Sequence, residues 1–230
     1  MKNVKLYTAI GYLKIKKYGE GHKYPVIVVN REEYAVDQQE AAVWTALCWR
    51  LCGTEELKER YADFSASLPP ERRTLERCLM RLVTRGLAAE GCGETQFEAL
   101  YDLLSDLYIM PVSQNMICRI PAFLSLVLCS GVPVSAAAIL FRRDHRTACE
   151  THVMMLSNQA LLSTAELIKC VEVGATDVST DMKLLDALYV DPDTTSDNIG
   201  LMMRTAKSRE PVTVAVANLY LRKQIILERV

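Results

Sequence analysis

The sequence lacks an excess of either charge and lacks a long hydrophobic run. Its 27 lysines and arginines are offset by 28 aspartates and glutamates, and the formal net charge is −1. The chain therefore has no overall positive field that would attract nucleic acid. The longest apolar run, residues 120–128, is too short to cross a bilayer and contains Pro121. We therefore expect no membrane partner.

The usual signatures of catalysis and of cofactor binding are also missing. The sequence contains no phosphate-binding glycine loop, no recognisable Ser/His/Asp arrangement and no paired-carboxylate signature. We therefore predict that the protein is not an enzyme and that it needs no cofactor.

A secretory leader is not apparent either. The first apolar residues are interrupted by several lysines, which are Lys2, Lys5, Lys14, Lys16 and Lys17. Most of the eight cysteines lie among apolar residues in helical patterns, where a free thiol packs as a small hydrophobe. These features favour a reducing compartment, and we predict a cytoplasmic protein.

The composition is that of an ordinary globular protein, and the charge is divided unevenly along the chain. Half of the 230 residues are hydrophobic and 24% are charged. Residues 1–90 hold 15 basic and 12 acidic residues (+3), which leaves 12 basic and 16 acidic residues (−4) for residues 91–230. This asymmetry favours a phosphate contact in the first part of the chain.

The pattern of elements predicts a mainly α (α+β) fold. Strands are expected at 6–15, 26–29 and 31–35, with helices at 38–51, 55–64 and 70–85. Leu87–Ala89 and the Gly-Cys-Gly that follows would form a further strand and turn. We expect β structure almost wholly in the first 36 residues and in the short piece that follows Gly86, and we find no internal repeat.

The rest of the chain reads as helical. Thr95 and Glu98 form a start signal for a helix that ends near Tyr108. Further helices are expected at 113–130, 135–141, 146–157, 164–173, 180–189, 196–207 and 212–228. We place a soft domain boundary near residue 93, which gives an N-terminal domain at 1–93 and a helical domain at 94–230.

The most informative stretch is the third predicted helix. Arg73, Arg77, Arg81 and Arg85 recur every four residues, so they would lie along one side of a helix, with Arg72 beside them. The planar guanidinium matches phosphates and guanine edges. We therefore name these five arginines as candidate nucleic-acid contacts. The alternative is a solvated face on which Glu71 and Glu76 pair with the arginines.

Residues 37–93 resemble the winged helix-turn-helix domains of bacterial transcription regulators. The segment "LERCLMRLVTRGLAAEGCG" is similar to the end of a recognition helix and the start of a wing. The resemblance implies a winged-helix-like three-helix unit and double-stranded DNA as the partner. The wing here is short or absent.

A second resemblance covers residues 24–91. The segments "YPVIVVNREEYAVDQQEAAVWTAL", "GTEELKERY" and "LERCLMRLVTRGL" are similar to the peptide-recognition domains of peptide-modifying pathways. Those domains bind a leader peptide as an added strand at a sheet edge, which implies an adaptor for a peptide or protein. In such an adaptor the free edge would lie near 26–29 or 6–15.

His145, Cys149 and His152 have the spacing of one helical face. Zinc could use all three but needs a fourth ligand, and none is near in sequence. An ordinary helix surface explains the same residues, so we assign no metal.

Three functions remain open at this point. The first is a DNA-binding transcriptional regulator whose helical domain serves assembly or sensing, with a homodimer formed through the last helix. The second is the peptide or protein adaptor. The third is a helical scaffold without a nucleic-acid role. A continuous positive face at the arginines would favour DNA, whereas paired arginines would favour the other two.

Overall fold

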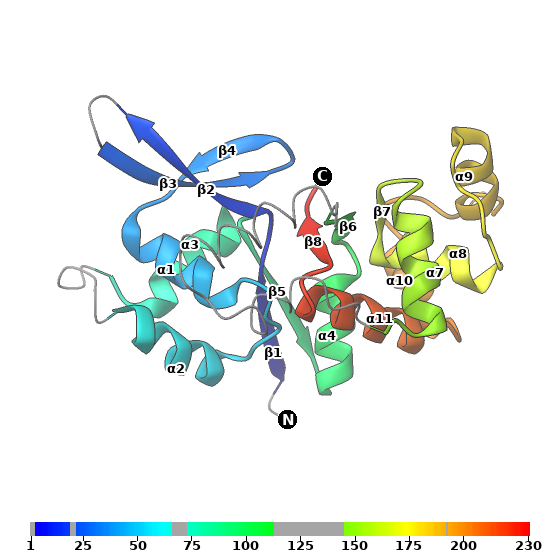
Figure 1. Cartoon of the computed structure of the whole chain (residues 1–230). Helices are drawn as coiled ribbons and strands as arrows, with labels where there is room; N and C mark the ends of the chain where they lie inside the picture. The colour runs from blue at the N-terminus through cyan, green and yellow to red at the C-terminus, as the bar shows by residue number, and fades with distance from the viewer. Residues whose placement is uncertain (1–2, 19–21, 66–72, 113–144, 192) are drawn as a thin grey trace.

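The computed structural model describes residues 3–18, 22–65, 73–112, 145–191 and 193–230 (Figure 1). These residues form an α+β fold, which confirms the predicted class. The first half contains β1 (Val4–Ala9), β2 (Tyr12–Tyr18), β3 (His22–Val29), β4 (Glu32–Ala35), α1 (Gln38–Leu47), α2 (Thr54–Ser65), α3 (Leu75–Thr84), β5 (Ala88–Gly93) and α4 (Gln96–Leu104). The second half contains β6 (Tyr108–Pro111), α7 (Ala148–Ser157), β7 (Leu162–Ser163), α8 (Thr164–Glu172), α9 (Asp181–Leu188), α10 (Ile199–Met202), the 3₁₀ helix η3 (Met203–Thr205), α11 (Arg209–Leu221) and β8 (Ile225–Glu228).

The strands form three small antiparallel sheets. Their orders are β1-β5, β2-β3-β4 and β7-β6-β8. In Figure 1 the β2-β3-β4 sheet stands at one end of the molecule, and β1, β5, α4 and β8 lie near its middle.

The strand predicted at 6–15 is two strands, because the chain bends sharply at Gly11. Gly11 has φ +76°, and a Cβ there would lie 2.0 Å from the Val28 carbonyl oxygen. Only glycine allows this conformation and this close approach. The bend sends β1 into the core beside β5 and sends β2 into the separate sheet.

The helix predicted at 38–51 ends early, at Leu47. Cys48 is extended and Trp49 has φ +52°, which is a strained conformation for an aromatic residue. The predicted second helix, 55–64, is confirmed as α2.

The third helix starts later than predicted. Thr74 is its N-cap and accepts a hydrogen bond from the Arg77 backbone N–H, so the helix begins at Leu75. At the other end Gly86 has φ +71°, and its N–H and that of Leu87 donate to carbonyls of the last turn. The predicted glycine stop is thus confirmed.

The piece expected to form a wing has a different role. β5 pairs with β1 along its length, from Ala9↔Ala88 to Val4↔Gly93. A Cβ on Gly91 or Gly93 would lie 2.4 Å from backbone atoms of α4. These glycines therefore allow α4 to pack directly on β5 and do not form the turn of a hairpin. The helix start predicted at Thr95 and Glu98 is confirmed as a capping box.

The second half, which was expected to be almost wholly helical, also contains strands. Tyr108–Pro111 and Ile225–Glu228 pair as strands, and the 212–228 segment leaves the helix at Lys223, which has φ +60°. The helix expected at 196–207 is reduced to α10 and η3. The segments expected at 113–130 and 135–141 lie outside the described residues. The helices predicted at 146–157, 164–173 and 180–189 appear as α7, α8 and α9.

The two halves share an order of elements that the sequence did not reveal. In each half a first strand, β1 or β6, pairs with the strand after the last long helix, β5 or β8. The other side of that first strand pairs with a short segment between two helices, at Cys52 or at Leu162–Ser163. The last long helices, α3 and α11, end in the same hydrogen-bond pattern.

One hydrophobic core runs through both halves. Tyr220 of α11 links them: its hydroxyl accepts from Thr8 Oγ1 and from the Trp49 N–H, both at 2.9 Å, and donates to the Ala9 carbonyl at 3.3 Å. α4, just after the boundary expected at residue 93, packs on β1 and β5. That boundary stays a prediction. In the described ranges, no helix is long and apolar enough to span a membrane.

Candidate functional site

The arginines expected on one helix face occupy different places. Arg73 precedes the helix, and Arg85 is its C-cap residue. Arg77 and Arg81 lie on the helix proper, and both are exposed. Arg72 lies outside the described residues.

Three of these arginines converge on the carboxylate of Glu40 in α1. Glu40 is buried, with 2% of its side chain exposed. Arg81 Nε lies 2.6 Å from Glu40 Oε1, and Arg85 Nη1 lies 3.1 Å from Oε2. Arg73 Nη1 adds a longer contact of 3.4 Å to Oε1. A buried carboxylate held by three guanidinium groups is a structural tie between α1 and α3.

Asp37 extends this ion-pair network at the start of α1. Its side chain accepts from the backbone N–H groups of Gln39 and Glu40, so Asp37 is the N-cap residue of α1. It also pairs with Arg73. Partial burial raises the pKa of Asp37, but the Glu40 N–H and the Arg73 guanidinium outweigh it and hold that pKa below its usual range. The Glu40 carboxylate binds Arg81 and Arg85 instead of capping the start of α1.

The exposed side of α3 is therefore not a row of free arginines. It presents Glu76, Arg77, Met80 and Arg81, and Arg81 is bound to Glu40. Arg77 is the exposed helix arginine for which the described part of the chain offers no ion pair. The alternative to DNA contact, paired arginines, applies here, although the partners are Glu40 and Asp37 and not the expected Glu71 and Glu76.

Of the two edges expected, only the second is an edge of this sheet: residues 12–15 of the strand predicted at 6–15 lie in β2, which is an edge strand. β3 is the central strand, and Val26, Ile27 and Val28 pair with both neighbours, so the edge expected at 26–29 is wrong. The edges are β2 and β4.

The hydrogen-bond register shows which backbone groups of β2 and β4 point outward. The Val36 N–H donates to the Pro25 carbonyl, and the bonds of an antiparallel pair alternate from there. The outward residues are Glu33 and Ala35 on β4, and Gly11, Leu13, Ile15 and Lys17 along β2 and the bend before it. Two bonds agree with this assignment, because the Gly11 N–H donates to Leu227 O at 2.8 Å and Ala35 O accepts from Arg85 Nη2 at 2.7 Å.

The two edges consequently differ. The edge of β4 is short, acidic and partly closed by the Arg85 contact. Within the described ranges, the edge of β2 is closed by β8 at Gly11 alone, the residue before the strand. From Leu13 onward, no strand among the described residues pairs with it. An open edge of this kind accepts an added strand.

A groove of about 410 Å³ lies beside the start of β2. It is mainly apolar and is lined by Gly11, Tyr12, Leu13, Trp44, Thr45, Cys48, Trp49 and Lys223. Burial raises the pKa of the Cys48 thiol to about 11, so this thiol is neutral at physiological pH. We call this feature the tryptophan groove, because it holds both tryptophans of the chain.

The two indoles are held firmly in place. Trp44 Nε1 donates to the carbonyls of Ile10 and Leu87, at 3.1 and 3.0 Å. Trp49 Nε1 donates to Ile225 O at 3.3 Å, and the Lys223 ammonium lies 5.3 Å from the centre of its ring. The strained backbone at Trp49 is thus fixed by contacts from the second half of the chain. Strain of this kind is often found at binding sites.

Lysines surround the open edge. β2 carries Lys14, Lys16 and Lys17, and Lys223 borders the groove. Lys14 and Lys16 both pair with Glu33 across the sheet. The hydrogen bond from Lys16 lowers the pKa of the Glu33 carboxyl. The edge as a whole is basic.

His145, Cys149 and His152 do not gather into a metal site. α7 begins at Ala148, so His145 precedes the helix, and His152 Nε2 lies 2.9 Å from the Ala175 carbonyl oxygen. The described residues contain no group of three His, Cys, Asp or Glu placed to hold a metal.

Trp44, Trp49, Lys223 and Glu40 are not among the site residues that the sequence predicts. The acidic Glu40 in an apolar helix face was the available signal. No local pattern links Lys223 to Trp49. Comparison of the chain with protein families, with curated proteins and with solved structures found no match.

Proposed function

We propose that the protein is a recognition module that binds an extended peptide or protein segment along the outer edge of β2. The observation that carries this proposal is the open run of outward backbone groups at Leu13, Ile15 and Lys17, next to the tryptophan groove. Backbone hydrogen bonds to β2 provide affinity, and the groove selects a side chain. The resemblance to peptide-recognition domains supports this mode of binding, and β2 contains residues 12–15 of the edge expected at 6–15.

The surroundings of the edge favour an acidic segment with a bulky apolar side chain. The lysines of β2 and Lys223 attract negative charge, and the indoles and Tyr12 favour an apolar or aromatic group. The side chain that enters the groove comes from the part of the segment nearest Gly11. Farther along, the segment runs beside the lysines.

Selection of random displayed peptides against the whole chain tests the proposal. We expect the selected peptides to share acidic residues and one large apolar residue, and to quench or shift tryptophan emission. Ile15→Pro removes an outward N–H, and we expect it to weaken binding about tenfold or more. Ile15→Thr keeps the N–H and serves as the control. Equal binding by the two variants would refute the β2 edge as the site.

DNA binding by a winged-helix unit is our second proposal. It is supported by the exposure of Arg77 and Arg81 on α3. Anisotropy titrations with duplex DNA at two salt concentrations test it, because each phosphate contact contributes to the salt dependence. If the protein binds DNA through α3, Arg77→Ala should lower its affinity for the duplex. Glu40→Gln should strengthen DNA binding by freeing Arg81 and Arg85. If the wild-type protein does not bind duplex DNA at low salt, this proposal is excluded.

A further inference from the structure

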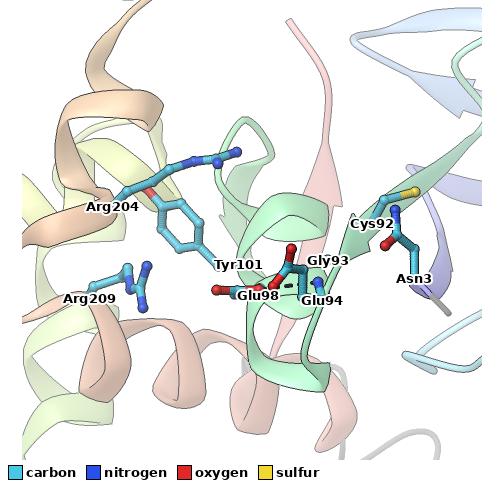
Figure 2. A pocket seen from close by; sticks show the side chains of 8 residues that line it. All are labelled: Asn3, Cys92, Gly93, Glu94, Glu98, Tyr101, Arg204 and Arg209. Carbon is cyan, nitrogen blue, oxygen red and sulfur yellow. Dashed lines mark hydrogen bonds between the residues drawn. The ribbon is translucent and has the colours of Figure 1, made fainter. Parts of the chain in front are cut away.

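A second cleft, of about 390 Å³, lies on a different part of the molecule. It is lined by Asn3, Cys92, Gly93, Glu94, Glu98, Tyr101, Arg204 and Arg209 (Figure 2). Its walls come from both halves of the chain. Its volume is within the range of small-molecule sites.

Arg209 is the best-positioned group in the cleft. Its guanidinium carbon lies 5.0 Å from the centre of the Phe97 ring and 5.4 Å from that of Tyr101. Tyr101 is buried and donates a hydrogen bond to the Gly200 carbonyl, so its ring is fixed. These two cation–π contacts hold the guanidinium in place, and a guanidinium group held in this way can bind a carboxylate through its N–H groups.

The Arg209 guanidinium has no carboxylate partner in the part of the chain that the structure describes. Arg204, on the same wall, makes a single contact of 3.3 Å with Asp102. Figure 2 shows the two arginines on one side of the cleft and Glu94 and Glu98 on the other. Two positive and two negative side chains thus face one cleft without an ion pair between them.

The glutamates complete the cleft on the side of β5. Glu98 Oε2 caps α4 by accepting the N–H groups of Glu94 and Thr95, at 3.1 and 3.3 Å. Glu94 is exposed, and its carboxylate has no hydrogen-bond partner within the described ranges. Burial, together with the contact to Glu90, raises the pKa of the Cys92 thiol above its ordinary value.

We infer that this cleft binds a small zwitterion of the amino-acid class. Its carboxylate pairs with Arg209 and Arg204, and its ammonium pairs with Glu94 and Glu98. A simple anion would meet the two carboxylates, and a simple cation would meet the two guanidinium groups, so neither fits the charges as well. Because the walls belong to both halves, the ligand stabilises their contact. This site is separate from the edge of β2.

Thermal unfolding of the whole chain with each standard amino acid in turn tests this inference. We expect at least one amino acid to raise the Tm in a concentration-dependent way. Its N-acetyl and methyl-ester forms, which lack one charge each, should have little effect. Inorganic phosphate is the probe for a simple anion site. No shift with any amino acid, or an equal shift with phosphate or with either blocked form, overturns the inference.

Variants then locate the site. Arg209→Gln and Glu94→Gln should each weaken binding of that amino acid about tenfold. Glu94 is exposed, so its variant remains informative if Arg209→Gln does not fold. Lys207→Gln, exposed and outside the cleft, and Ile15→Pro, at the other site, should bind normally. Unchanged affinity in both cleft variants would place the amino acid elsewhere and refute this site, whatever the outcome at β2.

Discussion

At the scale of single residues, Glu40 determines how much free positive charge α3 presents. Its buried carboxylate binds Arg81 and Arg85 directly and Arg73 more weakly. Removing its charge would leave three guanidinium groups to find water or other partners. The same residue thus ties α1 to α3 and limits the contact of α3 with nucleic acid.

Glu40→Gln keeps the shape of the side chain and removes its charge. We expect the free energy of unfolding to fall by about 2 kcal/mol, as for the loss of charged hydrogen bonds. The arginines are partly exposed and can turn to solvent, so the loss stays below that of a fully buried pair. Urea denaturation at neutral pH measures it, with Glu76→Gln on the exposed side of α3 as the control. If both variants are equally stable, Glu40 is not the tie that we describe.

Spacing in the sequence placed the arginines near one another but could not show their partners. A period of four residues describes one helix, whereas the binding carboxylate comes from another helix, more than 30 residues away. Caps and glycine stops were predictable because each depends on a few adjacent residues, as at Thr95 and Gly86. The early end of α1 was not predictable, because Trp49 is held by Tyr220 and Ile225.

At the scale of elements, the sheet is defined by which side of β2 is paired. The predicted strands at 26–29 and 31–35 were correct as strands, but their order in the sheet was not evident from the sequence. Gly11 divides β1 from β2, and this division creates the open edge. A one-dimensional pattern of apolar residues contains no signal for this bend beyond the glycine itself.

A pair of proline variants tests the assignment of outward and inward groups. Ile15 points its N–H outward, so Ile15→Pro should cost little stability, as proline is tolerated on an edge strand. The Lys14 N–H points to Val26 in β3, so Lys14→Pro should cost about 1–3 kcal/mol for the lost ladder bond. Losing the exposed Lys14–Glu33 ion pair in the same variant adds little to this loss of stability. Equal midpoints in a denaturation series would show that the register is misassigned.

At the scale of the whole molecule, two halves that share the pairing of their first and last strands are joined by a buried polar contact. Tyr220 receives hydrogen bonds from Thr8 and Trp49 of the first half. This shared arrangement could not be recognised in the sequence, because equivalent positions in the two halves carry different residue types. The left-handed residue that ends the last long helix is Gly86 in one half and Lys223 in the other.

Tyr220→Phe removes the shared hydroxyl and leaves the Thr8 hydroxyl and the Trp49 N–H without this partner. We expect the free energy of unfolding to fall by about 2 kcal/mol, because a polar group that is buried without a hydrogen-bond partner carries an uncompensated desolvation penalty. We also expect tryptophan emission to shift as Trp49 loosens. Tyr24→Phe, at an exposed position of β3, is the matched control. A Tyr220→Phe protein with control-like stability and emission would argue against coupling through this residue.

Residue-resolved hydrogen exchange along β2 tests the central claim most directly. In the free chain we predict fast exchange at the outward amides of Leu13, Ile15 and Lys17 and slow exchange at the inward amides of Lys14 and Lys16. A peptide selected on the whole chain should protect the outward amides and leave those of α3 unchanged. Outward amides already protected in the free chain, or protection confined to α3, would contradict the account.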